Sequence, residues 1–217
     1  RDGKRLARKL SFRKVEDVLE NLRARLYVTM FDPAKTVRYE EILDPLVDIR
    51  ASLIENYNSL YLDELDTLID KVNIFRTHFA TLDIRQNHGV HRQTVEAILK
   101  QEKLIANRLD ELGKAELLTI LLNRDIVVQP DQFDDAIIKD TIATIAQMAH
   151  IQRKNGTEGC NRYVISHAED IFAVLFVFSL LRWCGWTKGE LPVDIIPLFE
   201  SMEGMKNAGS IMQELFD

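Results

Sequence analysis

Three segments of the sequence end in polar side chains that could act together on an anionic substrate. They end at Arg85-Gln86, Ser166-His167 and Glu200-Ser201. An arginine guanidinium offers a planar fork to phosphate or carboxylate oxygens. A glutamate supplies the hard oxygen that Mg²⁺ or Mn²⁺ prefers. If the three segments lie side by side, these residue types predict a site for an anion and a divalent metal; otherwise they only mark strand ends that lead into solvent.

The elements that must position these residues alternate between strands and helices. We expect short strands, rich in apolar and β-branched residues, near 80–85, 162–166 and 193–199. Helical periodicity predicts helices over about 92–105, 114–122, 134–153, 169–183 and 206–216. This alternation predicts a parallel sheet, in which reactive residues collect where the strands end. The fold class is therefore an α-rich α/β fold, and because three strands cannot close a barrel, the section is typical of part of a larger object.

The first third of the chain follows a helical period throughout. Apolar residues recur at spacings of three and four over 15–26, 43–57 and 62–75. Ser11 is placed to cap the first helix, and Pro45 predicts a kink or a restart in the second. We therefore divide the chain into a helical lead-in segment, 1–78, and a section that carries the strands and the inserted helices, 79–217.

Composition and charge exclude several classes of protein. The net charge of −6 argues against nucleic acid or an anionic membrane as the main partner. The basic segment 1–14 could still bind either, although a solvated tail explains it as well. The most apolar run, 171–181, is too short to cross a bilayer, and no signal-peptide pattern is visible. Two cysteines form no disulfide framework and a poor zinc site, so we expect a reducing, cytoplasmic location.

Three motifs, in the same order and similar spacing, resemble phosphoenolpyruvate carboxylase of the bacterial type. Residues 82–86, with His91 six positions past Arg85, are similar to that family's LDIRQ-x-x-x-x-H segment. Residues 163–166 resemble its YVIS strand, and 197–200, followed by Asn207-Ala208, resemble its PLFE segment. The resemblance covers nearly the whole chain, whereas the family's proteins are several times longer. It therefore identifies the chain as an internal section of such a protein.

The resemblance implies a fold and a reaction. The fold is a (β/α)₈ TIM-type barrel with long inserted helices, of which this chain would hold about three parallel strands. The reaction converts phosphoenolpyruvate and bicarbonate to oxaloacetate and phosphate through carboxyphosphate and an enolate, with Mg²⁺ or Mn²⁺. Arg85 would contact the substrate as the catalytic and substrate-binding residue, and Glu200 would be a metal ligand. The whole protein would be a homotetramer.

Supporting roles fall to residues beside these two. We place His91, Gln86, Ser166 and His167 next to Arg85 and Glu200. The chain departs from the family pattern at Asn87-His88, where an acidic residue and a serine are usual, and at His167, where methionine is usual. His88 and His91 lie three positions apart, close to the spacing of metal ligands, but no third ligand is evident. We place them in a loop, where histidines are more often solvated.

Other features of the family are absent, and other functions stay open. The TAHPTE, GYSDS and FHGRGG segments do not occur, so we expect the chain by itself to be inactive. Without the resemblance, the residues equally suit another metal-dependent α/β enzyme that acts on a phosphorylated or carboxylate substrate. They also suit a helical interaction module in which the polar strand ends are incidental.

Overall fold

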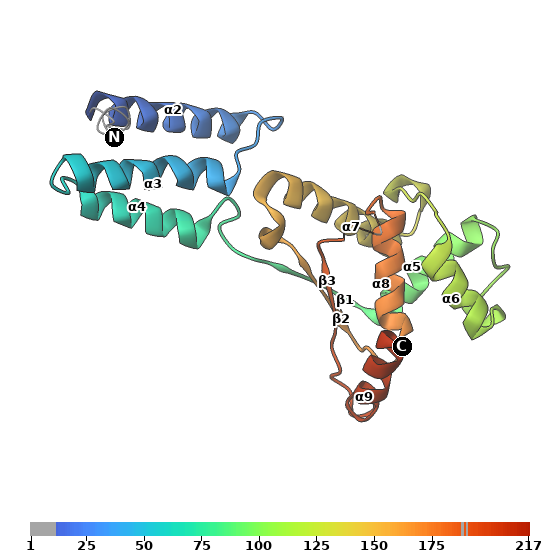
Figure 1. The fold of residues 1–217 in the computed structure, drawn as a ribbon. Helices are drawn as coiled ribbons and strands as arrows, with labels where there is room; N and C mark the ends of the chain where they lie inside the picture. Colours follow the sequence, from blue (N-terminus) through green and yellow to red (C-terminus); the bar gives the residue numbers. More distant parts are fainter. Residues whose placement is uncertain (1–11, 188, 190) are drawn as a thin grey trace. The chain divides into compact units, whose positions relative to one another are not determined.

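The chain folds into two compact units. The computed structural model describes residues 12–187, 189 and 191–217. We call the first unit, which runs to Thr81 and includes Arg153–Gly159, the helical unit, and the second, Leu82–Gln152 with Cys160–Asp217, the sheet unit. Figure 1 labels the elements of both. The expected cap Ser11 and nearly all of the basic segment 1–14 lie outside the described residues.

The helical unit contains the helices that the periodicity predicts. They are α2 (Phe12–Phe31), α3 (Tyr39–Asn56) and α4 (Leu62–Phe75). Their inward-facing apolar side chains form a core of Val15, Leu22, Ile42, Leu46, Ile49, Leu53 and Leu65. The guanidinium of Arg50 on α3 donates two hydrogen bonds, of 2.6 and 3.1 Å, to the carboxylate of Asp66 on α4. The core and this paired contact hold α3 and α4 together.

The restart expected at Pro45 does not occur. Helix α3 passes through Pro45 without interruption. Proline removes one backbone hydrogen bond from a helix interior. Here the turns on either side of Pro45 bury Ile42, Leu46 and Ile49 against the neighbouring helices. This burial offsets the missing bond, because each fully buried aliphatic side chain stabilises the fold by about 1.5–3 kcal/mol.

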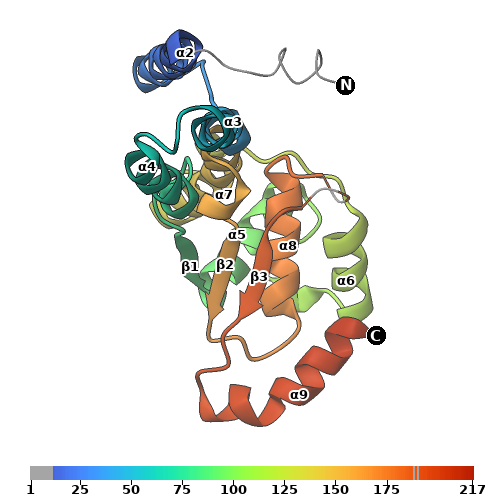
Figure 2. The same ribbon diagram turned by 60° about the vertical axis from the view of Figure 1, so that its left-hand side comes forward.

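The sheet unit is built on three parallel strands, which confirms the predicted sheet. They are β1 (Asp83–Asn87), β2 (Arg162–Ser166) and β3 (Asp194–Pro197), in the order β1-β2-β3. In register, Asn87 pairs with Ser166, so β1 and β2 end at the same level. Figure 2 shows the strands side by side, with α5 (His88–Gln101) and α8 (Phe172–Trp183) packed on one face.

The strand boundaries correct two of the sequence predictions. The first strand begins at Asp83 and not at residue 80, and it extends two residues further than expected, to Asn87. Pairing decides this, because the ladder starts where Asp83 faces Arg162, to which it is also ion-paired at 2.9 Å. The third strand is shorter than 193–199, because β3 pairs only with residues 162–165 of β2. The second strand has the predicted bounds.

The helices between the strands form the second core. Besides α5 and α8 they are α6 (Lys114–Asn123) and α7 (Ala136–Asn155). The last helix, α9 (Met202–Phe216), follows β3 and contributes no residue to this core. Helix α5 begins four residues before the expected start, and α9 likewise starts early, because Asn87 and Ser201 cap their first turns. His88 and His91 are therefore helical and not in a loop.

The apolar run 171–181 becomes the buried helix α8. Phe176, Leu180 and Trp183 of α8 are almost completely buried among residues of α5, α6, α7 and the sheet. Its last turn is tied to α6, since Arg182 donates to the carbonyl oxygens of Leu121 and Leu122 at 3.1 and 2.8 Å. In the described part of the chain, no helix has the length and apolar character needed to cross a membrane.

Candidate active site

Arg85 lies on the face of the sheet opposite to α5 and α8. Successive side chains of a strand point to opposite faces. Ile84 and Gln86 are in register with Tyr163 and Ile165, whose side chains are buried on the helix side. Arg85, between them, points the other way and is exposed. It makes no hydrogen bond or ion pair with any described residue, so its guanidinium is available to an anion.

Gln86 and Ser166 also lie at the carboxyl ends of their strands. Gln86 is half-buried on the helix side, and its Oε1 accepts the backbone N–H of Asn87 at 2.8 Å. Ser166 is half-buried beside Asn87 at the last step of the ladder. Both side chains therefore lie at the carboxyl ends of their strands, and their supporting roles stay predictions.

Glu200 and His167 are brought together at the same edge. Nδ1 of His167 is 3.0 Å from Oε1 of Glu200, and the same oxygen accepts the backbone N–H of His167 at 3.2 Å. The chain after β3 stays beside β2, because the N–H of Leu198 donates to Ile165 and that of Ala168 donates to Leu198. This extension of the ladder carries the carboxylate of Glu200 to the end of β2.

Asn87 is a site residue that the sequence analysis misses. Its Oδ1 accepts the N–H of Gly89 at 2.7 Å and so caps α5. Its Nδ2 lies 3.2 Å from Nδ1 of His167. An asparagine directly before a helix is a recognisable capping signal. The contact with His167 depends on the register of β1 and β2, which no local pattern reveals.

His91 lies behind the sheet, on the side covered by helices. Its ring is fully buried, and its Nε2 lies 2.9 Å from the hydroxyl of Tyr163 on β2. Burial, with a smaller contribution from the neighbouring His88, lowers the pKa of His91 to about 3. Burial likewise raises the pKa of Tyr163. Two neutral groups therefore join α5, which follows directly from β1, to the central strand.

His88 packs in the apolar interior. Its ring stacks on Phe176 with centroids 5.7 Å apart and planes within 6°. Burial is the main cause that lowers the pKa of His88; Asp170 and Glu169 oppose this shift and Arg92 adds to it. A neutral, stacked ring suits packing, and the spacing of His88 and His91 does not produce a pair of metal ligands.

The donor set at this edge suits one ligand of a divalent metal. Glu200 has a hard carboxylate, and its Oε2 makes no hydrogen bond or ion pair with the residues that the structure describes. Mg²⁺ and Mn²⁺ favour such oxygen ligands. Over residues 12–187, 189 and 191–217, however, no three histidine, cysteine, aspartate or glutamate side chains gather around one point. Glu200 therefore fits as one metal ligand, and the described residues do not complete a metal site.

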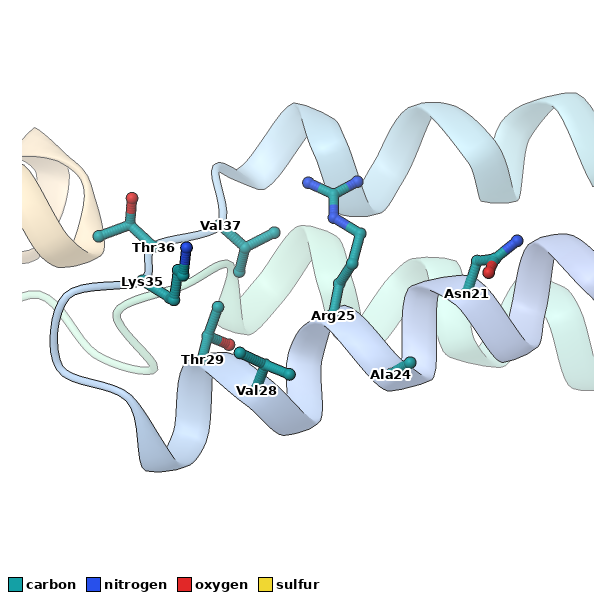
Figure 3. Close-up of a pocket in the computed structure, with 8 residues that line it drawn as sticks. All are labelled: Asn21, Ala24, Arg25, Val28, Thr29, Lys35, Thr36 and Val37. Atoms are coloured by element: carbon teal, nitrogen blue, oxygen red, sulfur yellow. The ribbon is translucent and has the colours of Figure 1, made fainter.

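A hollow in the helical unit contains none of the predicted site residues. It has a volume of about 450 Å³ and lies against α2 and the segment that follows it. Figure 3 shows Arg25, Thr29 and Lys35 among the side chains that line it. The guanidinium of Arg25 is already paired with Glu41 at 2.9 Å. The strand ends of the sheet unit thus remain the better candidate for chemistry.

Comparison with known proteins decides the family. The family model described as phosphoenolpyruvate carboxylase matches residues 5–217. The chain belongs to this family. The phosphoenolpyruvate carboxylases of Synechocystis sp. and Thermosynechococcus vestitus are 29% and 30% identical to it, each over 185 residues. That of Aromatoleum aromaticum is 31% identical over 185 residues.

The match to these carboxylases covers most of this chain and a small part of each relative. It takes in 82% of this chain against the two cyanobacterial proteins and 81% against the third. The chain spans about 18% of the first two carboxylases and 20% of the third. Family membership thus agrees with the resemblance carried by the LDIRQ, YVIS and PLFE segments, which supply Arg85, Ser166 and Glu200.

Proposed function

We propose that the chain is an internal section of a phosphoenolpyruvate carboxylase. The whole protein would convert phosphoenolpyruvate and bicarbonate to oxaloacetate and phosphate, by way of carboxyphosphate and an enolate. The observation that carries this proposal is the match of the family model to residues 5–217. The exposed cation and the carboxylate at the ends of parallel strands are the chemistry that such a substrate needs.

Arg85 is proposed to bind the anionic substrate. Phosphoenolpyruvate carries a phosphate and a carboxylate, and a guanidinium can take two oxygens of either group at once. Arg85 is exposed, and no described residue competes for it. Fixed cationic charge beside a reacting phosphate stabilises the charge that develops in the transition state. We therefore assign Arg85 the roles of substrate binding and catalysis.

Glu200 is proposed to be one ligand of Mg²⁺ or Mn²⁺. When bound, such a metal supplies Lewis-acid stabilisation to an oxygen anion. The part of this chain is to present a carboxylate with one unoccupied oxygen at the sheet edge. The other ligands would come from parts of the carboxylase that the chain does not span. The chain by itself should accordingly be inactive.

The three-stranded sheet is proposed to be part of a TIM-type (β/α)₈ barrel. In such a barrel the helices surround the outside and the active site lies at the carboxyl ends of the strands. Helices α5 and α8 pack on one face of the sheet, and Arg85 points from the other. Outer strands need neighbours, because an unpaired edge exposes backbone N–H and C=O groups. Further strands of the whole protein would pair with β1 and β3.

The expected setting of the whole protein is a homotetramer in the cytoplasm. Its partners would be the two small substrates, with no role for nucleic acid or a membrane. Light scattering of the purified whole protein measures the subunit number directly. A monomer would contradict this part of the proposal without touching the chemistry.

The test is the formation of oxaloacetate by the whole protein with Mg²⁺, compared with Arg85→Ala and Glu200→Gln. Loss of one charge contact to the transition state should lower the rate by about 10²–10³-fold in each variant. The matched controls are Arg124→Ala and Glu102→Gln, which change exposed residues at the far ends of α6 and α5 and should keep the wild-type rate.

Each contrary result has a separate meaning. Full activity of Arg85→Ala and Glu200→Gln would remove the proposed site and leave the reaction standing. A whole protein with no carboxylase activity would contradict the proposed reaction. It would favour the other metal-dependent enzyme that the residues suit.

A further inference from the structure

His167 has an imidazole nitrogen with two competing neighbours. Its Nδ1 is 3.0 Å from Oε1 of Glu200 and 3.2 Å from Nδ2 of Asn87. A ring nitrogen either carries a proton and donates or lacks one and accepts. The amide of Asn87 cannot turn to relieve the competition, because its Oδ1 is held by the N–H of Gly89. Nδ1 can therefore satisfy only one neighbour at a time.

The backbone of His167 aims its side chain at this point. Its φ of +56° lies in the left-handed region, which residues other than glycine rarely adopt. Such a conformation persists where the surrounding structure enforces it, and it clusters at functional sites. Here hydrogen bonds of Leu198 to Ile165 and of Ala168 to Leu198 fix the chain on both sides of the turn. The turn also directs the N–H of His167 toward Glu200.

Glu200 thus receives two contacts on one oxygen and none on the other. The backbone N–H and the ring of His167 both address Oε1. Among the described residues, Oε2 has no hydrogen-bond or ion-pair partner. A carboxylate held in this way has a defined rotation and presents a single oxygen for a ligand. Groups that orient a metal-binding side chain usually contribute strongly to metal affinity.

We propose that His167 is the positioning residue for Glu200. Its Nδ1 carries a proton and donates a hydrogen bond to Oε1 instead of accepting one from Asn87, so that Oε2 is left for the metal. The inference rests on the proposed metal-binding role of Glu200.

The test is Mn²⁺ binding by the whole protein without substrate, followed by the loss of the free-ion EPR signal. His167→Ala should raise the Kd for Mn²⁺ about tenfold, the lower end of the usual cost of losing such an orienting group. His167→Asn should restore most of the affinity, because its amide places an N–H near the position of Nδ1 and asparagine tolerates positive φ. The control is His150→Ala, an exposed histidine of α7, which should bind as wild type.

Steady-state kinetics separate positioning from general damage. If His167 acts by orienting Glu200, His167→Ala should raise the KM for Mn²⁺ and leave kcat at saturating Mn²⁺ nearly unchanged. A wild-type Kd in His167→Ala, or a lower kcat with an unchanged Kd, would overturn the inference and leave the carboxylase function intact. If Glu200→Gln also binds Mn²⁺ like the wild type, the proposed metal ligand is wrong, and this inference is overturned with it.

Discussion

The buried histidine of α5 should make the sheet unit sensitive to acid. His91 is fully buried, and its pKa is lowered from 6.5 to about 3 by burial. In the unfolded chain the ring returns to its ordinary pKa and binds a proton more readily. Its contribution to stability is therefore complete above pH 6.5 and is lost as the pH falls from 6.5 toward 3.

The size of the effect follows from the separation of the two pKa values. A pH of 5 is 1.5 units below the pKa of 6.5 that His91 has in the unfolded chain, so the unfolded ring is protonated. The same pH is well above the pKa of about 3 in the folded chain, so the folded ring stays neutral. At 1.36 kcal/mol per unit, His91 should cost about 2 kcal/mol of unfolding free energy between pH 7.5 and pH 5. Below pH 3 the loss should level off near 5 kcal/mol.

Denaturant unfolding followed by tryptophan fluorescence measures the loss of unfolding free energy in the sheet unit. Both tryptophans, Trp183 and Trp186, belong to the sheet unit, as does His91. We compare the wild-type chain with His91→Gln, which cannot titrate but can still bond the hydroxyl of Tyr163. The variant should lose about 2 kcal/mol less than the wild type between the two pH values.

A variant of a second histidine serves as the control. His150→Gln removes an exposed histidine and should keep the full pH dependence of the wild type. If His91→Gln shows the same difference between pH 7.5 and pH 5 as the wild type, the burial of His91 does not set its pKa. The reasoning would then be refuted.

Three further outcomes follow from the packing. Tyr163→Phe should destabilise the sheet unit by about 1–3 kcal/mol in the same assay, because it leaves Nε2 of His91 buried without a partner. Gly159→Ala should lower the stability of the helical unit by about 1–3 kcal/mol, since a new Cβ would lie 2.6 Å from Cβ of His78; circular dichroism during thermal unfolding measures this, and an unchanged melting temperature would contradict it. Burial raises the pKa of the half-buried Cys184 to about 12, so at pH 8 this thiol should react with a disulfide reagent much more slowly in the folded chain than after denaturant is added. Equal labelling rates in the two states would contradict this raised pKa.

Local patterns predicted the elements well, and their boundaries less well. The helical period located α2, α3 and α4, because an amphipathic helix needs apolar residues at three- and four-residue spacing. It placed α5 four residues too late. The cap at Asn87 begins that helix before its first apolar repeat, so the period alone could not find the start.

In the candidate site, local patterns were enough to propose individual residues but not to predict the contacts between them. Residue types and motif spacing were enough to propose Arg85 and Glu200, because a fork-shaped cation and a hard carboxylate limit the chemistry that they can do. Nothing local connected Asn87 with His167, or His91 with Tyr163. These contacts join residues about 70–80 positions apart, and only strand pairing, with α5 packed on the sheet in the case of His91, brings them within 3.2 Å.

The sequence by itself therefore predicted the three-stranded parallel α/β arrangement and the family, and it suggested which residues to propose for anion and metal chemistry. These properties depend on side-chain type and on spacing along the chain. The tertiary structure decided which face Arg85 occupies, which oxygen of Glu200 is left without a contact, and that His91 is neutral. Those properties depend on register and burial, which arise only when β1, β2 and β3 are paired and the helices cover one side of the sheet.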